Sequence, residues 1–113
     1  MNIQIFGTNK CFDTKKAQRY FKERGIKFQF IDLTQKSLSR GELNSVIACV
    51  GTLEDVINEK SKYYEKSFIK YLAGEEAKIE KILECGELLK TPIVRNGRIA
   101  TIGYCPEVWK TWE

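Results

Sequence analysis

Cys11 is the residue whose type and position most favour chemistry. It lies between a short apolar run, residues 3–6, and a stretch of helical periodicity, residues 13–24. The first N–H groups of a helix lack intrahelical partners and carry partial positive charge, which favours the thiolate, the nucleophilic form of cysteine. The local motif is Cys-x-x-Thr, ending at Thr14, and not Cys-x-x-Cys. The sequence therefore predicts one active thiol at this site, although a buried, inert cysteine is the competing interpretation.

The neighbours of Cys11 act on the predicted thiolate in different ways. Lys10 could stabilise it by charge, whereas Asp13 would oppose it. Thr14 is either an ordinary residue of the helix start or also a hydroxyl donor to the thiolate, and either Asp13 or Thr14 can cap the helix. The sequence leaves the balance between these effects open.

The remaining cysteines are widely scattered, at Cys49, Cys85 and Cys105. No pair has metal-ligand spacing, so no metal site is predicted. Cys49 and Cys85 lie among Ile, Val and Leu, which favours packing in the core. The chain has no histidine, which excludes a Ser-His-Asp triad, a Cys-His pair and a His-ligated metal.

Composition places the chain in a broad class. Its 113 residues predict a single domain, residues 1–113, and 42% hydrophobic residues are enough for a core. The net charge of +4 comes from lysines interleaved with glutamates, a pattern typical of solvated helices and not of a nucleic-acid-binding face. No run approaches the roughly 18 apolar residues of a membrane span, and the first residues do not resemble a signal peptide. We expect a cytoplasmic protein without direct nucleic-acid or membrane contacts.

Periodicity and turn signals predict an α/β fold. Gly25 follows the first helix as a C-terminal cap, Ser39 to Glu42 forms a capping box, and Asn96-Gly97 is a strong hairpin signal. A helical insert is expected at about residues 39–90, and within it residues 53–58, 60–71 and 75–89 are predicted to be helical. The predicted strands are residues 3–6, 28–32, 91–95 and 98–103, and the last helix is residues 106–112. This β-α-β, helices, β-β-α order predicts a four-stranded mixed sheet with helices on both faces, in thioredoxin-like (glutaredoxin-like) topology.

Two segments resemble a known family. The segment 9–17, Asn-Lys-Cys-Phe-Asp-Thr-Lys-Lys-Ala, resembles the cysteine-bearing turn of the arsenate reductase (ArsC)/Spx family of thioredoxin-fold proteins, and in particular its small uncharacterised ArsC-like members. The later Thr-Pro-Ile-Val…Ile-Gly-Tyr…Glu-Val segment, residues 91–108, is similar to the family's Arg-Pro-Ile-(Val/Ile)…Gly-(Tyr/Phe) hairpin. The resemblance spans essentially the full length.

The resemblance implies a thiol-dependent oxidoreductase. Cys11 takes the place of the catalytic cysteine and would attack an oxyanion or a small thiol substrate. Glutathione, glutaredoxin or thioredoxin would then supply electrons, with no bound cofactor. Pro92 takes the place of the cis-proline and, with Thr91, would shape the substrate edge. Cys105, at the end of the last strand, is either a resolving thiol or an incidental semi-buried cysteine.

The chain departs from the family at the three arginines with which the classical reductases hold the oxyanion. Thr91 stands before the proline, Lys60 or Glu59 stands in the insert, and no arginine lies near Cys105. Arginine binds oxyanions bidentately, which lysine and threonine cannot do. Thiol chemistry is therefore predicted, and arsenate is not favoured as its substrate. Lys60 either supplies residual positive charge to the site or belongs to a solvated helix face.

A second function stays open. Spx-type regulators of the same family bind the RNA polymerase α-subunit and use a Cys-x-x-Cys redox switch. Here Thr14 replaces the second cysteine, which excludes that local disulfide, whereas Gly51-Thr52 and residues 60–62 are similar to the Spx insert. A partner-binding module of this type is the alternative to an enzyme.

Overall fold

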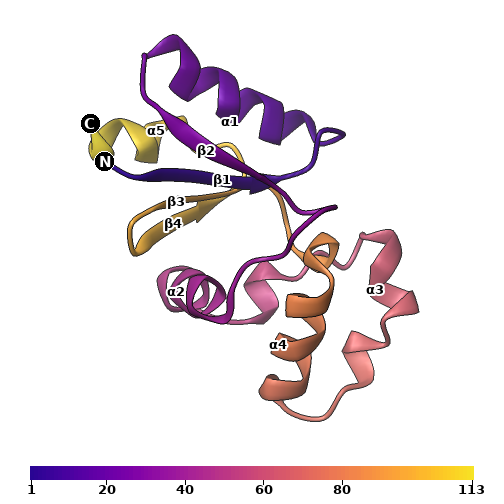
Figure 1. The fold of residues 1–113 in the computed structure, drawn as a ribbon. Helices are drawn as coiled ribbons and strands as arrows, with labels where there is room; N and C mark the ends of the chain where they lie inside the picture. The colour runs from indigo at the N-terminus through magenta and orange to yellow at the C-terminus, as the bar shows by residue number, and fades with distance from the viewer.

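A four-stranded mixed sheet with the strand order β2-β1-β3-β4 forms the centre of the molecule (Figure 1). The computed structural model describes residues 1–113. Strands β1 and β2 are parallel, and β3 is antiparallel to both β1 and β4. The strands are β1 (Ile3–Gly7), β2 (Phe28–Asp32), β3 (Ile93–Asn96) and β4 (Ile99–Ile102). The predicted α/β fold with thioredoxin-like topology is confirmed.

Helix α1 (Phe12–Glu23) connects the two parallel strands and begins earlier than predicted. Its N-cap is Cys11, not Asp13 or Thr14, and no side chain caps the first turn. The reason lies in the backbone: the Cys11 carbonyl already accepts a hydrogen bond from the Lys15 N–H at 3.2 Å. The predicted end is confirmed, because Gly25 follows the helix with a φ of +68°.

The insert between β2 and β3 opens with α2 (Arg40–Val50), and the capping box of Ser39 and Glu42 is confirmed. The rest is more broken than the three helical stretches that the sequence predicts. It consists of η1 (Glu54–Val56), α3 (Lys62–Lys66), η2 (Ile69–Tyr71), α4 (Glu75–Glu84) and η3 (Gly86–Leu88). Helix α4 stops before Gly86, where a Cβ would lie 3.0 Å from Leu33 Cδ2 and 3.1 Å from the Ser37 Cα. Tertiary packing thus replaces one predicted long helix by two short elements.

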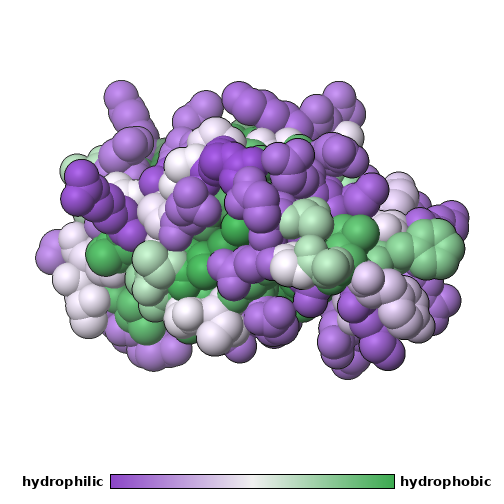
Figure 2. All heavy atoms as spheres, turned by 90° about the horizontal axis from the view of Figure 1, so that it is seen from below, coloured by the Kyte–Doolittle hydropathy of each residue, from purple (hydrophilic) through white to green (hydrophobic).

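Two apolar layers cover the two faces of the sheet. On one face α1 and the C-terminal elements α5 (Pro106–Trp109) and η4 (Lys110–Trp112) pack around Trp109, whose Nε1 donates to Thr101 Oγ1 at 2.8 Å. The larger layer lies between the other face of the sheet and the insert, which includes α2. Figure 2 views the molecule from the insert side and shows hydrophobic surface between hydrophilic side chains. None of the helices has the length and apolar character needed to cross a bilayer.

One of the two cysteines predicted to pack in the core does not. Cys85 is half-buried and packs against the larger apolar layer, as predicted, whereas Cys49 is exposed. The Cys49 thiol lies on the edge of β4, where it donates to the Ala100 carbonyl and accepts from the Ala100 N–H, each at 3.3 Å. Its position is set by unpaired backbone groups of an edge strand, which the apolar neighbours in the sequence do not reveal.

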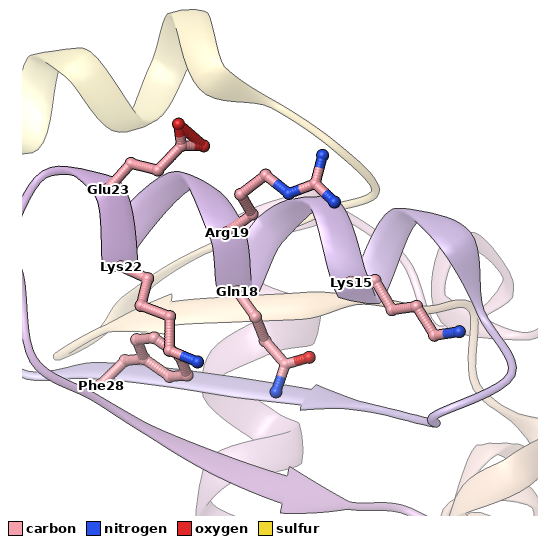
Figure 3. Close-up of a pocket in the computed structure, with 6 residues that line it drawn as sticks. All are labelled: Lys15, Gln18, Arg19, Lys22, Glu23 and Phe28. Carbon is pink, nitrogen blue, oxygen red and sulfur yellow. The ribbon is translucent and has the colours of Figure 1, made fainter.

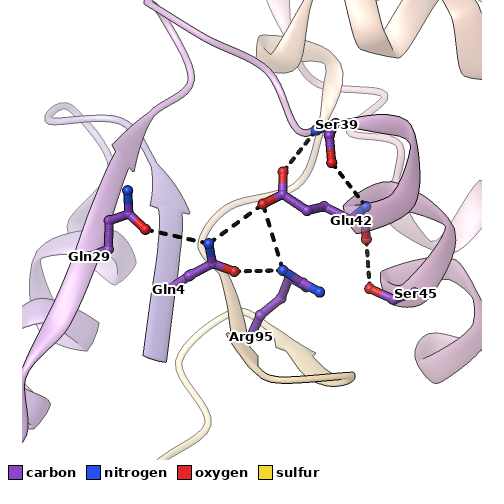
Figure 4. Close-up of polar contacts among 6 residues, drawn as sticks. All are labelled: Gln4, Gln29, Ser39, Glu42, Ser45 and Arg95. Atoms are coloured by element: carbon purple, nitrogen blue, oxygen red, sulfur yellow. Dashed lines mark hydrogen bonds and ion pairs between the residues drawn. The ribbon is translucent and has the colours of Figure 1, made fainter. Parts of the chain in front are cut away.

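A polar network joins the sheet to the start of α2 (Figure 4). The Arg95 guanidinium donates to Gln4 Oε1 and lies 3.7 Å from Glu42 Oε2. Glu42 Oε1 also accepts from the Ser39 N–H at 2.8 Å. The Arg95 side chain is only 14% exposed, and its Nε has no hydrogen-bond partner. Glu42 is therefore both a helix cap and the counter-charge of a largely buried guanidinium.

Replacing Glu42 by alanine tests this double role. We expect Glu42→Ala to lower the free energy of unfolding by about 2 kcal/mol, because it removes a cap and leaves a buried cation without its partner. Glu80→Ala is the matched control, since Glu80 is an exposed partner of Arg40, and its loss should cost less than about 0.5 kcal/mol. Urea denaturation followed by circular dichroism measures both, and equal losses would contradict the assignment.

Candidate functional site

Cys11 lies at the start of α1, next to the first residues of β3. Its sulfur accepts a hydrogen bond from Thr91 Oγ1 at 3.2 Å, and the Thr91 carbonyl lies 3.8 Å from the same sulfur as an acceptor. The peptide bond between Thr91 and Pro92 is cis, as the resemblance implies. The structure thus brings together two segments that are 80 residues apart in the chain.

Two opposing effects act on the pKa of Cys11. Burial raises the pKa, whereas the Thr14 and Thr91 hydroxyls and the N–H groups of Thr14 and Asp13 lower it, because these donors favour the thiolate. The donors together outweigh burial, so the pKa lies below the ordinary value of a cysteine thiol. The two N–H groups belong to the first turn of α1, where such donors have no helical partner. The arrangement favours a nucleophilic thiolate.

Thr14 is the polar side chain with the tightest surroundings at this site. It is fully buried, and its hydroxyl has no partner within hydrogen-bond geometry, the Cys11 sulfur included. It lies close enough to the Cys11 sulfur to lower the thiol pKa. A buried hydroxyl without a partner is costly, and the thiolate is a stronger acceptor than the thiol. Ionisation of Cys11 therefore satisfies a donor that the thiol form leaves poorly paired.

Gly7, at the end of β1, makes room for this hydroxyl. A Cβ at position 7 would lie 2.3 Å from Thr14 Oγ1 and 2.6 Å from its Cγ2, closer than any real contact. The sequence does not reveal this requirement for glycine at position 7, because the side chain that needs the space, Thr14, lies seven residues further along the chain. The site depends on this small residue although it carries no reactive group.

A pocket of about 640 Å³ opens beside Cys11. Lys60 and Lys90 line it, and neither lysine forms an ion pair. The two glutamates of the lining have partners: Glu54 lies 3.7 Å from the Lys78 ammonium, and Glu59 accepts from the Tyr64 hydroxyl at 3.4 Å. Ile57 and Ile102 supply apolar walls, and no arginine contributes. The lining of the pocket thus includes two lysines outside any ion pair and one carboxylate, Glu59, without a cationic partner.

The structure places the other predicted site residues differently. Lys10 is exposed, does not line the pocket and is not among the groups that shift the Cys11 pKa. Cys105 is half-buried at the start of α5, where its thiol donates to the Ile102 carbonyl at 3.3 Å. Burial, followed by Glu107, raises the pKa of Cys105. Cys105 does not line the pocket of Cys11, and all four cysteines are free. No group of three or more His, Cys, Asp or Glu side chains could hold a metal ion.

Lys90 is one of several pocket residues that the sequence motifs do not indicate. It directly precedes Thr91, and its N–H donates to the Val56 carbonyl at 2.8 Å, which fixes the segment against the insert. The available signal was its position next to the expected cis-proline. The side chain's reach into the pocket follows only from how the insert packs against β3.

The role of Thr14 can be tested through the pH dependence of Cys11 alkylation. In wild type we expect the rate to rise with an inflection below the pH of an ordinary thiol, since the pKa is lowered. Thr14→Val, which loses the hydroxyl at nearly equal volume, should move the inflection to higher pH and slow alkylation at pH 6 by about three- to tenfold. Thr14→Ser keeps the hydroxyl and should stay near wild type. Identical profiles for the valine and serine variants would contradict this role.

Comparison with known proteins follows the geometry. The ArsC family matches residues 6–112. Global transcriptional regulator Spx 2 of Oceanobacillus iheyensis is 27% identical over 109 residues, which span 92% of this chain and 78% of that protein. Among solved structures, an ArsC family related protein from Bacteroides fragilis has a TM-score of 0.84 at 20% identity and covers 100% of this chain and 98% of its own. An arsenate reductase from Vibrio cholerae has a TM-score of 0.81 at 22% identity, with 96% and 94% covered.

The two structural likenesses show the fold, with its sheet and its helical insert. The family match includes Cys11, the insert and the hairpin that follows Pro92. Because this match runs through nearly the whole chain, the chain belongs to the ArsC family.

Proposed function

We propose that the chain is a thiol-dependent oxidoreductase of ArsC-like type that works through the single nucleophilic thiol of Cys11. The observation that carries the proposal is the thiol itself, which meets the first-turn N–H groups of α1 and the Thr91 hydroxyl, 3.2 Å away, at the wall of an open pocket. The hydrogen-bond donors lower the pKa of the thiol, and the open pocket exposes the thiol to a substrate.

The proposed reaction is a thiol–disulfide exchange in two steps. The Cys11 thiolate attacks one sulfur of a small disulfide, which forms a mixed disulfide on Cys11 and releases the other half as a thiolate that takes up a proton. Glutathione, as an external thiol, then attacks the substrate sulfur of the mixed disulfide, which regenerates Cys11 and releases the substrate half joined to glutathione as a disulfide. When the half held on Cys11 is itself glutathione, this product is glutathione disulfide; otherwise a second glutathione frees the substrate half as a thiol and forms glutathione disulfide. Glutaredoxin or thioredoxin is an equivalent donor. The reaction needs reduced thiols, which prevail in the proposed location, the cytoplasm.

The charge of the pocket bears on the substrate. Arginine pairs, which bind tetrahedral oxyanions bidentately, are missing from the lining, which speaks against arsenate. Lys60 and Lys90 instead offer two point charges, neither of them in an ion pair, beside the one unpaired carboxylate of Glu59. Such a pocket suits a substrate that carries carboxylates some distance from its reacting sulfur. The mixed disulfide of glutathione and cysteine is a substrate of this kind.

Turnover of that mixed disulfide, with glutathione as donor and glutathione reductase to follow glutathione disulfide, tests the proposal. We expect Cys11→Ser to reduce the rate to the uncatalysed background, because no other thiol lines the pocket. Cys49→Ser is the matched control and should keep wild-type turnover, since Cys49 lies on the edge of β4. Lys60→Ala combined with Lys90→Ala should raise KM by about fivefold with little change in kcat. Background rates for wild-type protein would reject the enzyme.

A regulator of Spx type is the second candidate, and the insert supplies an observation that favours it. Phe68 and Tyr71 are 64% and 76% exposed, and they share a surface hollow with Tyr64 and Lys70. Phe68 is also held at a φ of +56°, an uncommon conformation for a bulky residue. Exposed aromatic groups of this kind mark protein-binding surfaces. The relative from Oceanobacillus iheyensis is named a global transcriptional regulator.

Binding to the isolated C-terminal domain of the RNA polymerase α-subunit separates the two candidates. For a regulator we expect a stable complex in a pull-down that Cys11→Ser leaves intact. Phe68→Ser together with Tyr71→Ser should weaken it by about tenfold or more, because exposed aromatic anchors dominate such interfaces. A complex that is absent, or that survives the double substitution, would reject this surface as the binding site.

A further inference from the structure

The two edge strands of the sheet, β2 and β4, differ in whether their outward backbone groups form hydrogen bonds. At the β4 edge the Cys49 thiol bonds both the N–H and the C=O of Ala100, so α2 covers this edge. At the β2 edge no backbone group of residues 28–31 forms a hydrogen bond outside the sheet. Only the Asp32 carbonyl, at the end of β2, accepts bonds from the following turn. An open edge of this kind is a template for an additional strand.

A row of basic side chains lies beside the open edge (Figure 3). Lys15, Arg19 and Lys22 line a hollow of about 400 Å³ on α1, together with Phe28 of β2. Lys15 and Lys22 point from α1 toward β2, whereas Arg19 points away from β2, toward the C-terminal segment. All three are exposed, and none forms an ion pair with a carboxylate. Glu23 is the one acidic residue of the lining. At helical spacing the row extends over about 10 Å.

We propose that the β2 edge and the basic row of α1 together form a docking surface for an extended acidic segment of a partner protein. The segment pairs with β2 as a fifth strand and places every second side chain toward α1. Alternate residues of a strand lie about 6.7 Å apart on one face, so three of them span about 13 Å. That length is comparable to the basic row, so acidic side chains at the two ends of the segment lie beside Lys15 and Lys22, which point toward β2. Phe28, which lines the same hollow, supplies an apolar contact for a side chain of the segment.

Charge and backbone geometry select this occupant over two others. A second copy of the chain, paired edge to edge, would bring two basic rows together, and their repulsion disfavours a dimer. A nucleic acid would satisfy the cations but would leave the N–H and C=O groups of β2 without strand partners. An acidic extended segment satisfies both parts of the surface.

A synthetic peptide of eight alternating glutamates and valines, labelled with fluorescein, is the probe. Fluorescence anisotropy with the full chain should show saturable binding that weakens with salt. Lys22→Glu should weaken binding by about tenfold or more, because it reverses a charge of the row that points toward β2. Lys66→Glu is the matched control: Lys66 is exposed on α3, and its change should have less than about a twofold effect. Amide exchange should slow at β2.

Two further probes distinguish strand pairing from charge alone. The same peptide methylated on alternate backbone nitrogens keeps its charge but cannot pair with a strand, and we expect it to bind at least about tenfold more weakly. Equal binding of the methylated peptide, tighter binding of an eight-nucleotide oligothymidylate, or no binding of the acidic peptide would each overturn the proposal. Binding should be the same for Cys11→Ser, so the outcome does not depend on the thiol reaction proposed above.

Discussion

The antiparallel pairing of β1 with β3 is the constraint on which the site depends. Phe6 lies opposite Ile93 in this pairing, so the last residues of β1 and the first residues of β3 lie side by side at one end of the strands. The turn after β1 carries Cys11, and the residue pair before β3 is Thr91-Pro92. Their contact at 3.2 Å follows from the register. If β3 paired with β1 one residue out of this register, the Thr91 hydroxyl would no longer lie beside the Cys11 sulfur.

The same corner shows a tension between stability and reactivity. Thr14 is buried with its hydroxyl poorly paired, and Gly7 is required to fit it. In a protein selected for stability alone, alanine or valine at position 14 would remove the unpaired hydroxyl. The hydroxyl becomes useful only when the Cys11 sulfur is negatively charged, because the thiolate then accepts it. The corner is thus organised around one ionisation state of the sulfur.

Local signals were enough to predict the fold, and tertiary packing decided what they missed. The capping box at Ser39, the left-handed Gly25 and the Asn96-Gly97 turn depend on neighbouring residues, so the sequence locates them correctly. The break before Gly86 and the exposure of Cys49 depend on distant segments, respectively Leu33 and the edge of β4. At the site, the place of Cys11 followed from the order of elements. The free charges of the pocket follow from how the insert packs, which periodicity does not encode.

Helix α1 connects the thiol site to the open sheet edge. Its buried face, with Ala17 and Phe21, packs on the sheet, and its first turn faces the Cys11 sulfur. Lys15, the first member of the basic row, comes one turn later, since its N–H donates to the Cys11 carbonyl at 3.2 Å. A segment docked along the row as a fifth strand would therefore reach the same end of the sheet as the thiol, with β2 and β1 between the segment and the Thr91 side of the site. A partner held in this way would present a disulfide next to its docking segment at a high effective concentration. The helix that activates the thiol would then also select which disulfide reaches it.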